Sequence, residues 1–179
     1  GDDTHLTLFE MLGNFSFGDY FKKEACEWAL EFMIEVLGFE KDRLFITIYK
    51  DDDETKDIWL NLGIEEKYIY KFGDEDNWWG PAGEEGPCGP CSELHYYQGD
   101  KRNMSFNDPN WGPNLNEDFI ELYNLVFTQF YRDIEGNDKP LPFNNIDTGM
   151  GLERTVSVLN NQETAYKTDI FNDHLEMLN

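Results

Sequence analysis

Apolar residues recur at helical spacing in the first part of the chain. Between residues 19 and 37 they fall three or four positions apart, and Gly38 follows directly. This spacing gathers apolar side chains on one face of a helix, and glycine is common just beyond a helix end. Ser16, three residues before Asp19, is typical of a helix start. We therefore predict an amphipathic helix over residues 19–37.

Beyond this helix the chain alternates between segments typical of strands and segments typical of loops. Stretches rich in β-branched and aromatic residues predict strands at residues 44–50, 68–72, 92–98 and 119–131, and a short helix is predicted at 53–62. Clusters of Gly, Pro and acidic residues predict loops at residues 73–90 and 99–116. The pattern therefore combines several strands with a few helices.

One row of side chains stands out in the last of these strands. Alternation puts Ile120, Leu122, Asn124 and Val126 on one face, where Asn124 is the strong hydrogen-bonding group among apolar neighbours. A buried amide requires a partner, which is either another buried side chain or a bound ligand. The same alternation points Glu121 away from this row unless a bulge intervenes.

Composition defines the setting of these elements. The chain has 179 residues, of which 40% are hydrophobic and 16% aromatic, which predicts one folded domain over residues 1–179. No apolar run reaches the roughly 18 residues of a membrane span and no secretory leader opens the chain. We expect no membrane partner and a cytoplasmic location.

The chain is strongly acidic, with a formal net charge of −23. Most of such a surface repels phosphate backbones, so an RNA contact must use a local basic patch or groups supplied from elsewhere. Adaptation to high salt or a simple gain in solubility would produce the same acidity. The charge therefore does not identify a function.

The most informative run extends from Asn145 to Arg154. An extended stretch passes through Gly149 and Gly151 into an apolar segment with helical spacing, which is typical of a nucleotide or small-ligand site. The run lacks the third glycine of the dinucleotide-binding fingerprint. Taken alone, it is equally compatible with a structural turn.

Two further runs change this interpretation. They extend from His5 to Phe21 and from Gly86 to Glu93, and together with the glycine run they match, in order and spacing, the catalytic core of alanyl-tRNA synthetases. The resemblance covers the chain from about Asp3 to Asp173. It implies an α+β fold with a mainly antiparallel class II sheet flanked by helices. It begins inside the hairpin called motif 2, so we expect a core truncated at its N-terminus.

The resemblance also implies a reaction and its nucleotide site. Such enzymes use ATP with Mg²⁺ to convert L-alanine to alanyl-adenylate and then charge alanine tRNA. His5 would lie near the γ-phosphate, Phe9 and Arg154 would cover the two faces of adenine, and Gly149 and Gly151 would admit the ligand. The reaction needs positioning and charge neutralisation, so no catalytic nucleophile is expected. The residues that would hold a metal are not identified.

A second set of residues is implied to bind alanine. Asp147 would hold the α-ammonium group, although an aspartate capping the next helix is the alternative. Asn124 would hydrogen-bond the amino acid, while Leu122 and Trp79 would limit the space for its side chain. Met11 would reach the same pocket or fill a gap in the core. Without the resemblance, both tryptophans of the loop are as well explained as core caps.

The three cysteines argue against a disulfide framework. Cys88 and Cys91 are spaced as half of a zinc site or a redox pair. Only His95 follows nearby, so fewer than four zinc ligands are visible and we expect no zinc in this segment. We favour a rigid Gly-Pro-Cys-Gly-Pro-Cys turn that shapes the pocket.

Two other functions remain open at this stage. An inactive synthetase-like module would bind alanine, adenylate or a partner without turnover, because the arginine of the first motif 2 strand lies outside this chain. An acidic interaction domain would have no ligand site at all. Contacts with alanine tRNA are expected mainly through domains outside the chain.

Overall fold

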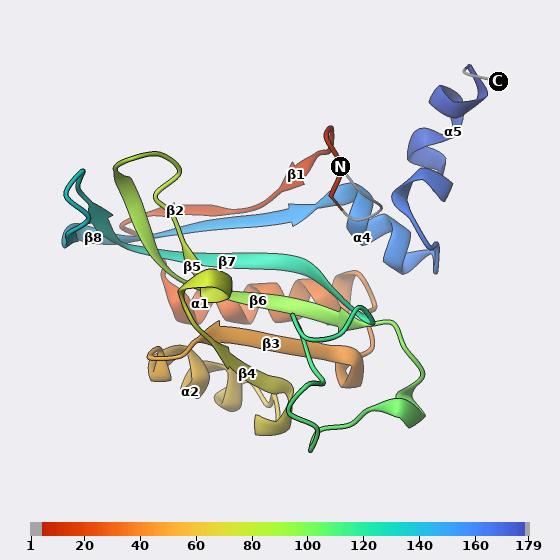
Figure 1. Ribbon diagram of the computed structural model, residues 1–179, viewed down its shortest axis with the longest axis horizontal. Coiled ribbons are helices and arrows are strands. Elements are labelled where there is room, and N and C mark those ends of the chain that lie inside the picture. The colour runs from red at the N-terminus through yellow and green to blue at the C-terminus, as the bar shows by residue number, and fades with distance from the viewer. Residues whose placement is uncertain (1–4, 178–179) are drawn as a thin grey trace.

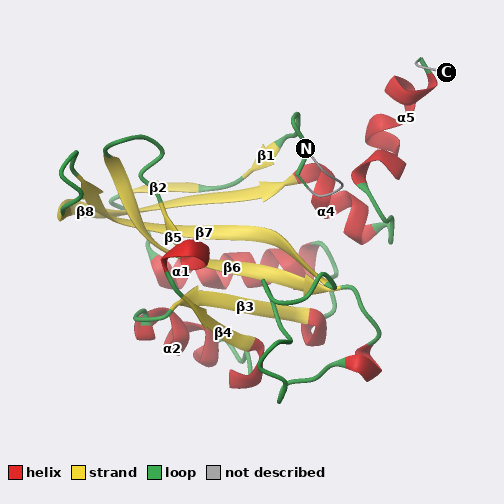
Figure 2. Cartoon of the chain, viewed as in Figure 1, coloured by secondary structure: helices red, strands yellow, loops and turns green. Residues whose placement is uncertain are grey.

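The computed structural model describes residues 5–177 and is built on one eight-stranded sheet (Figures 1 and 2). The strand order is β1 (Met11–Leu12), β8 (Asp138–Gly151), β7 (Phe119–Arg132), β6 (Gly86–Tyr97), β3 (Leu44–Tyr49) and β4 (Ile69–Phe72). Two further strands, β2 (Phe15–Phe17) and β5 (Trp78–Trp79), pair with β8 and β6. All pairs are antiparallel except β3 with β4. The predicted mainly antiparallel α+β fold is therefore confirmed.

Two helices cover one face of the sheet. Helix α1 (Lys22–Glu31), extended by a π-helical turn (Phe32–Val36), and helix α2 (Asp53–Asn61) pack buried side chains against the strands. Helices α4 (Leu152–Leu159) and α5 (Asp169–Glu176) follow β8, and the short α3 (Asp74–Asn77) precedes β5. Single 3-10 turns occupy Lys41–Arg43, Glu66–Tyr68, Lys101–Asn103 and Ala165–Lys167. The layer of α1 and α2 leaves the opposite face of the sheet for other segments.

The first predicted helix differs at both ends from the observed one. It begins at Lys22 rather than at residue 19 and ends in the π-helical turn. Ser16 lies in β2, where its hydroxyl accepts from the Asp19 N–H at 3.2 Å and donates to the Tyr20 carbonyl at 2.7 Å. The serine therefore closes the turn between strand and helix instead of capping the helix.

The prediction of a loop over residues 73–90 is wrong for most of its length. This segment holds α3, β5 and the start of β6, and the Gly-Pro-Cys run is an extended strand. Gly89 explains how the strands approach so closely, because a Cβ there would lie 2.1 Å from the Phe127 carbonyl oxygen. Gly89 therefore allows close packing of β6 against β7 rather than a turn.

The second face carries its own cluster of aromatic residues. Phe45, Tyr97 and Trp111 are buried together under the long segment that follows β6, which crosses in front of the sheet in Figure 1. The predicted loop at 99–116 is confirmed apart from its single 3-10 turn. Within residues 5–177 no helix combines the length and apolarity needed to cross a membrane.

Candidate functional site

A pocket of about 460 Å³ opens on the face of the sheet that α1 and α2 leave free. The structure brings to its walls every residue that the sequence analysis assigned to ATP or alanine. These are His5, Phe9, Met11, Trp79, Leu122, Asn124, Asp147, Gly149, Gly151 and Arg154. Residues from both ends of the chain and from its middle therefore meet at one place.

The floor of the pocket comes from the two longest strands. In the register of β7 with β8, Asn124 lies opposite Gly149, and Val126 lies opposite Asp147. Directly opposed residues of an antiparallel pair point to the same face, so these four residues share the pocket side. Val126 was predicted beside Asn124 without a role, although alternation along the strand is enough to place it in the pocket.

A bulge in β7 brings Glu121 to the pocket. Leu94 pairs with Tyr123 but His95 pairs with Glu121, so Leu122 is an extra residue on β7. The bulge turns Glu121 toward the pocket and moves Ile120 to the helix-covered face. The predicted row is therefore wrong at Ile120. Leu122 touches the pocket but is 2% exposed and packs mainly in the core.

The Asp147 carboxylate faces the pocket without an ion pair or hydrogen bond to any residue of the described range 5–177. Loss of hydration raises the pKa of this carboxyl above its ordinary value. The N-cap of α4 is Gly151, and no side chain caps this helix. The alternative role of Asp147 as a helix cap is thereby excluded. A cationic ligand group would find an open acceptor here.

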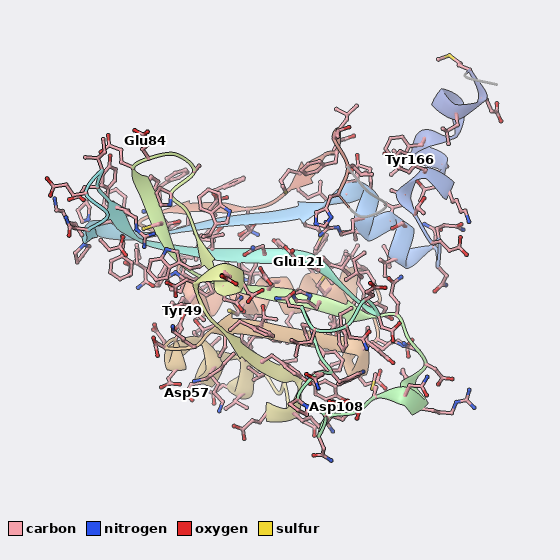
Figure 3. All side chains as sticks on the ribbon, viewed as in Figure 1. Tyr49, Asp57, Glu84, Asp108, Glu121 and Tyr166 are labelled. Carbon is pink, nitrogen blue, oxygen red and sulfur yellow. The ribbon has the colours of Figure 1, made fainter. Side chains whose placement is uncertain are left out.

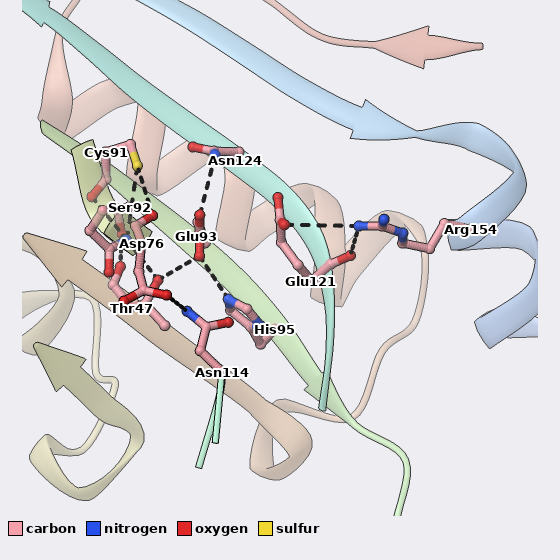
Figure 4. A network of polar contacts seen from close by, with 11 residues as sticks. Thr47, Asp76, Cys91, Ser92, Glu93, His95, Asn114, Glu121, Asn124 and Arg154 are labelled. Carbon is pink, nitrogen blue, oxygen red and sulfur yellow. Dashed lines mark hydrogen bonds and ion pairs between the residues drawn. The ribbon is translucent and has the colours of Figure 1, made fainter. Parts of the chain in front are cut away.

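Asn124 is only partly satisfied by the protein. Its Nδ2 donates to Glu93 Oε1 at 3.3 Å, as Figure 4 shows, whereas its Oδ1 is buried and has no hydrogen-bond partner among residues 5–177. One end of the amide therefore meets a buried side chain, which is the first of the two predicted alternatives, and the other end is left without a partner. An unpaired buried oxygen is costly, and a ligand donor would remove this cost.

Glu121 and Arg154 form the opposite wall. The Arg154 guanidinium donates from Nη1 to the Glu121 carbonyl at 2.9 Å and lies 3.9 Å from Glu121 Oε2. Loss of hydration and the nearby Glu93 carboxylate raise the pKa of the Glu121 carboxyl, although 38% of its side chain is exposed. Figure 3 shows Glu121 on β7, near the middle of the sheet.

The segment that carries Phe9 and Met11 is tied to α4. The Glu10 N–H donates to both carboxylate oxygens of Glu153 at 3.0 Å, and the Leu152 N–H donates to the Glu10 carbonyl at 2.9 Å. Phe9 is 45% exposed and Met11 is 60% exposed. Met11 therefore does not fill a gap in the core, and both side chains remain accessible to a ligand.

The two adjacent tryptophans have different surroundings. Trp78 stacks on Phe130 with ring centroids 5.8 Å apart, and the Arg132 guanidinium lies over its ring. Trp79 pairs with Gly89 across β5 and β6 and is 40% exposed at the pocket. Trp78 therefore packs against neighbouring side chains, whereas Trp79 remains exposed at the pocket.

The cysteines of the Gly-Pro-Cys run are free and buried. Loss of hydration is the main cause that raises the pKa of both thiols. The described residues contain no group of three or more His, Cys, Asp or Glu side chains that could hold a metal ion. The favoured rigid turn is also wrong, since both cysteines lie within β6.

Several wall residues were missed at the sequence level. Leu6, Phe15, Thr148 and Glu153 join Glu121 and Val126 in lining the pocket. Thr148 fixes the β1–β2 segment by accepting from the Asn14 N–H at 2.7 Å and donating to the Asn14 carbonyl at 3.0 Å. No local sequence pattern predicts such contacts, because the two partners lie more than a hundred positions apart in the chain.

Comparison with known proteins places this architecture in a family. The sequence profile of the family described as "tRNA synthetases class II (A)" matches residues 1–178. The chain belongs to this family. Class II tRNA synthetase membership thus accounts for the mainly antiparallel sheet.

Curated relatives of this class II tRNA synthetase chain are alanine–tRNA ligases. The chain is 56% identical over 169 residues to that of Pseudothermotoga lettingae, covering 93% of the chain and 20% of the relative. It is 49% identical over 171 residues to that of Dehalococcoides mccartyi, and 47% identical over 182 residues to that of Rubrobacter xylanophilus. These alignments cover 96% of the chain, and 20% and 21% of the two relatives. The chain therefore spans about a fifth of the length of these relatives.

Proposed function

We propose that this chain forms the amino-acid-activating core of an alanine–tRNA ligase, as a single catalytic domain over residues 1–179. The observation that carries the proposal is the meeting of the open Asp147 carboxylate, the unpaired Asn124 Oδ1 and the exposed Trp79 ring in one pocket. Two acceptors beside an apolar wall suit a small amino acid with a cationic α-ammonium group.

The alanine end of the pocket would work as follows. Asp147 and Asn124 Oδ1 accept hydrogen bonds from the α-ammonium, which leaves the substrate carboxylate free to react. Trp79 and Met11 enclose the methyl group, with Leu122 behind them. The charge-assisted bond to Asp147 is the stronger of the two polar contacts.

The nucleotide end would use residues nearer α4. Phe9 and Arg154 enclose the adenine ring from its two faces, and His5 lies at the γ-phosphate. Gly149 and Gly151 expose the β8 backbone, so the ligand can approach closely. The bond from Arg154 to the Glu121 carbonyl holds the guanidinium near this position.

The reaction is an in-line displacement. An oxygen of the alanine carboxylate attacks the α-phosphorus of ATP, the bond to pyrophosphate breaks, and alanyl-adenylate forms. The chain binds and orients both reactants, and no side chain becomes covalently attached. Mg²⁺ supplies charge neutralisation for the phosphates when bound. Such ions are commonly held by one or two carboxylates plus phosphates, and Glu121 is the pocket carboxylate suited to this.

The proposal extends to the longer protein. Alanine tRNA would receive the alanyl group, with most of its contacts made outside this acidic chain, because the net charge of −23 opposes a phosphate backbone. Such tRNA charging serves translation, so we place the activity in the cytoplasm.

Isothermal titration with a non-hydrolysable alanyl-sulfamoyl adenosine tests the proposal. The wild-type chain is expected to bind it, and Asp147→Asn is expected to weaken binding by about 10- to 100-fold, which corresponds to loss of a charged hydrogen bond. Asp57→Asn is the matched control, because Asp57 is exposed on α2 and its substitution removes the same charge.

Alanine-dependent exchange of pyrophosphate into ATP then separates an enzyme from a binding module. Exchange by the wild-type chain supports activation. Binding without exchange would support the inactive synthetase-like module, and no binding by the wild-type chain would contradict the proposed site.

A further inference from the structure

A buried polar network includes Asn124, a residue of the pocket wall (Figure 4). Its centre is Glu93 on β6, whose carboxylate accepts from His95 Nε2 at 2.9 Å and from Thr47 Oγ1 at 3.0 Å. Glu93 is 6% exposed and His95 is 2% exposed. A carboxylate removed from water in this way persists only with donors around it. Neither residue has a role in the proposed reaction.

The hydrogen bonds of the network run in one direction. Asn77 Nδ2 donates to Thr47 Oγ1 at 2.8 Å, which makes the threonine hydroxyl hydrogen available to Glu93 Oε2. The remaining oxygen, Glu93 Oε1, faces Asn124 at 3.3 Å. An ionised carboxylate only accepts hydrogen bonds, so the group of Asn124 that faces it must be the NH₂ group.

This direction fixes the other end of the amide. With its NH₂ group held by Glu93, Asn124 has Oδ1 as the amide end left for a ligand: this oxygen is buried without a hydrogen-bond partner within residues 5–177, and Asn124 lines the pocket. We propose that Glu93 is a positioning residue that sets the orientation of the Asn124 amide, so that the pocket selects a ligand carrying a cationic amine. This inference rests on the proposed function, which places an α-ammonium at Asn124.

The isosteric substitution Glu93→Gln reverses the direction of the contact. The side-chain oxygen of the variant would still accept from His95 and Thr47, but the NH₂ group introduced at position 93 would face Asn124. The Asn124 amide would then turn its oxygen toward position 93 and its NH₂ group toward the ligand ammonium. A donor would meet a donor, and recognition of the amine would be lost without a change in pocket volume.

Two ligands distinguish positioning from a merely structural role. We would titrate wild type and Glu93→Gln with alanyl-sulfamoyl adenosine and with its propionyl counterpart, which lacks the amine. The variant is expected to bind the alanyl compound about 10- to 100-fold more weakly, and the propionyl compound within about twofold of wild type. In the double variant Glu93→Gln/Asn124→Asp, the carboxylate at position 124 turns one oxygen toward the NH₂ group at position 93 and the other toward the ligand ammonium. Binding of the alanyl compound is therefore expected to recover.

Equal losses for both ligands would show that Glu93 only supports the fold, and no loss for either would show that it does not act on the ligand. Both results overturn the inference while leaving the proposed function intact. Failure of the wild-type chain to bind the alanyl compound would instead overturn the proposed function and this inference with it.

A measurement on the wild-type chain covers the case in which Glu93→Gln does not fold. Nuclear Overhauser contacts from the Asn124 NH₂ hydrogens are expected to the side chains of Glu93 and Thr47, with the analogue bound. Contacts from these hydrogens to the alanyl methyl or α-hydrogen would overturn the proposed orientation.

Discussion

Val126 and Asp147 lie directly opposite each other on β7 and β8, so a branched apolar side chain and an open carboxylate share one wall of the pocket. This pairing places a size limit beside the proposed anchor of the α-ammonium. A ligand held by Asp147 must therefore fit its side chain against Val126. The register of two strands, rather than any single residue, creates this combination.

Enlarging Val126 is expected to change amino-acid selectivity. Val126→Ile adds one methylene group to the pocket wall, which would crowd the alanine methyl group but leave room for glycine. We expect affinity for the alanyl analogue to fall by about tenfold relative to the glycyl analogue, in the range that one methylene group confers. Titration of both analogues against the variant measures this ratio.

The control for this experiment is Val36→Ile, which makes the same change at a 66% exposed position at the end of the π-helical turn. It should leave both affinities unchanged. Equal losses for the two analogues in Val126→Ile would indicate general overpacking of the sheet and contradict a selective wall.

Gly89 is expected to control the position of Trp79, its partner across β5 and β6. In Gly89→Ala the new methyl group would clash with the Phe127 carbonyl oxygen on β7, so β6 and β7 must separate. We expect a loss of about 1–3 kcal/mol in the free energy of unfolding, as for other overpacked sites, together with weaker analogue binding. Urea unfolding and titration measure the two effects.

Gly83→Ala is the matched control, because no heavy atom lies within 4 Å of the Cβ it would add. Wild-type stability in Gly89→Ala would show that β6 and β7 can separate without cost. Trp79 would then not depend on the glycine for its position.

The sequence predicted α1, α2, α4 and four of the eight strands, because these segments carry their own periodicity. Residues 44–50 and 119–131 alternate visibly, and they became β3 and β7 with ends shifted by at most two positions. The site residues were predicted from a different kind of evidence. The family resemblance that the three runs carry implied them, whereas their meeting in one pocket depends on the register of β7 with β8.

What the sequence could not provide were features set by contacts distant in the chain. The bulge at Leu122 reverses alternation, and nothing around Glu121 indicates it. Gly89 and its flanking prolines suggested a turn, although the neighbouring strand required a residue without a side chain. The partners of Glu93 come from β3, from β7 and from its own strand β6, so its network is visible only after folding.

Lys22 and Asp52 provide a test of the fold away from the pocket. Their ion pair measures 2.8 Å with both side chains 5% exposed, and Asp52 also accepts from the Thr55 N–H at the start of α2. Asp52→Ala would leave a buried ammonium without its main partner and remove a helix cap. We expect a loss of about 3–5 kcal/mol in the free energy of unfolding, measured by urea denaturation.

Glu54→Gln is the control for this pair. Glu54 lies 3.0 Å from the same Lys22 ammonium, but its side chain is 67% exposed. Its removal should cost less than about 1 kcal/mol, as expected for a solvated ion pair. Similar losses in the two variants would contradict the dominant role of the buried pair.

The ionised Asp147 carboxylate is expected to lower the stability of the folded chain while it supports binding of the alanyl analogue. Burial raises the pKa of its carboxyl in the folded chain, so the ionised form is less favourable there than in the unfolded chain. The resulting loss of stability is absent below the ordinary pKa of about 3.9, and it is complete once the pH exceeds the raised value. Asp147→Asn never carries this charge and should therefore melt at a higher temperature than wild type at pH 7.

Thermal unfolding at a series of pH values tests this expectation. The difference in melting temperature between Asp147→Asn and wild type should narrow as the pH falls toward 4. Over the same interval, wild-type affinity for the alanyl analogue should decline as the carboxylate takes up a proton. A lower melting temperature for Asp147→Asn at pH 7 would show that the folded chain stabilises the ionised carboxylate. Asp147 would then be a structural anion rather than an acceptor held open for a ligand.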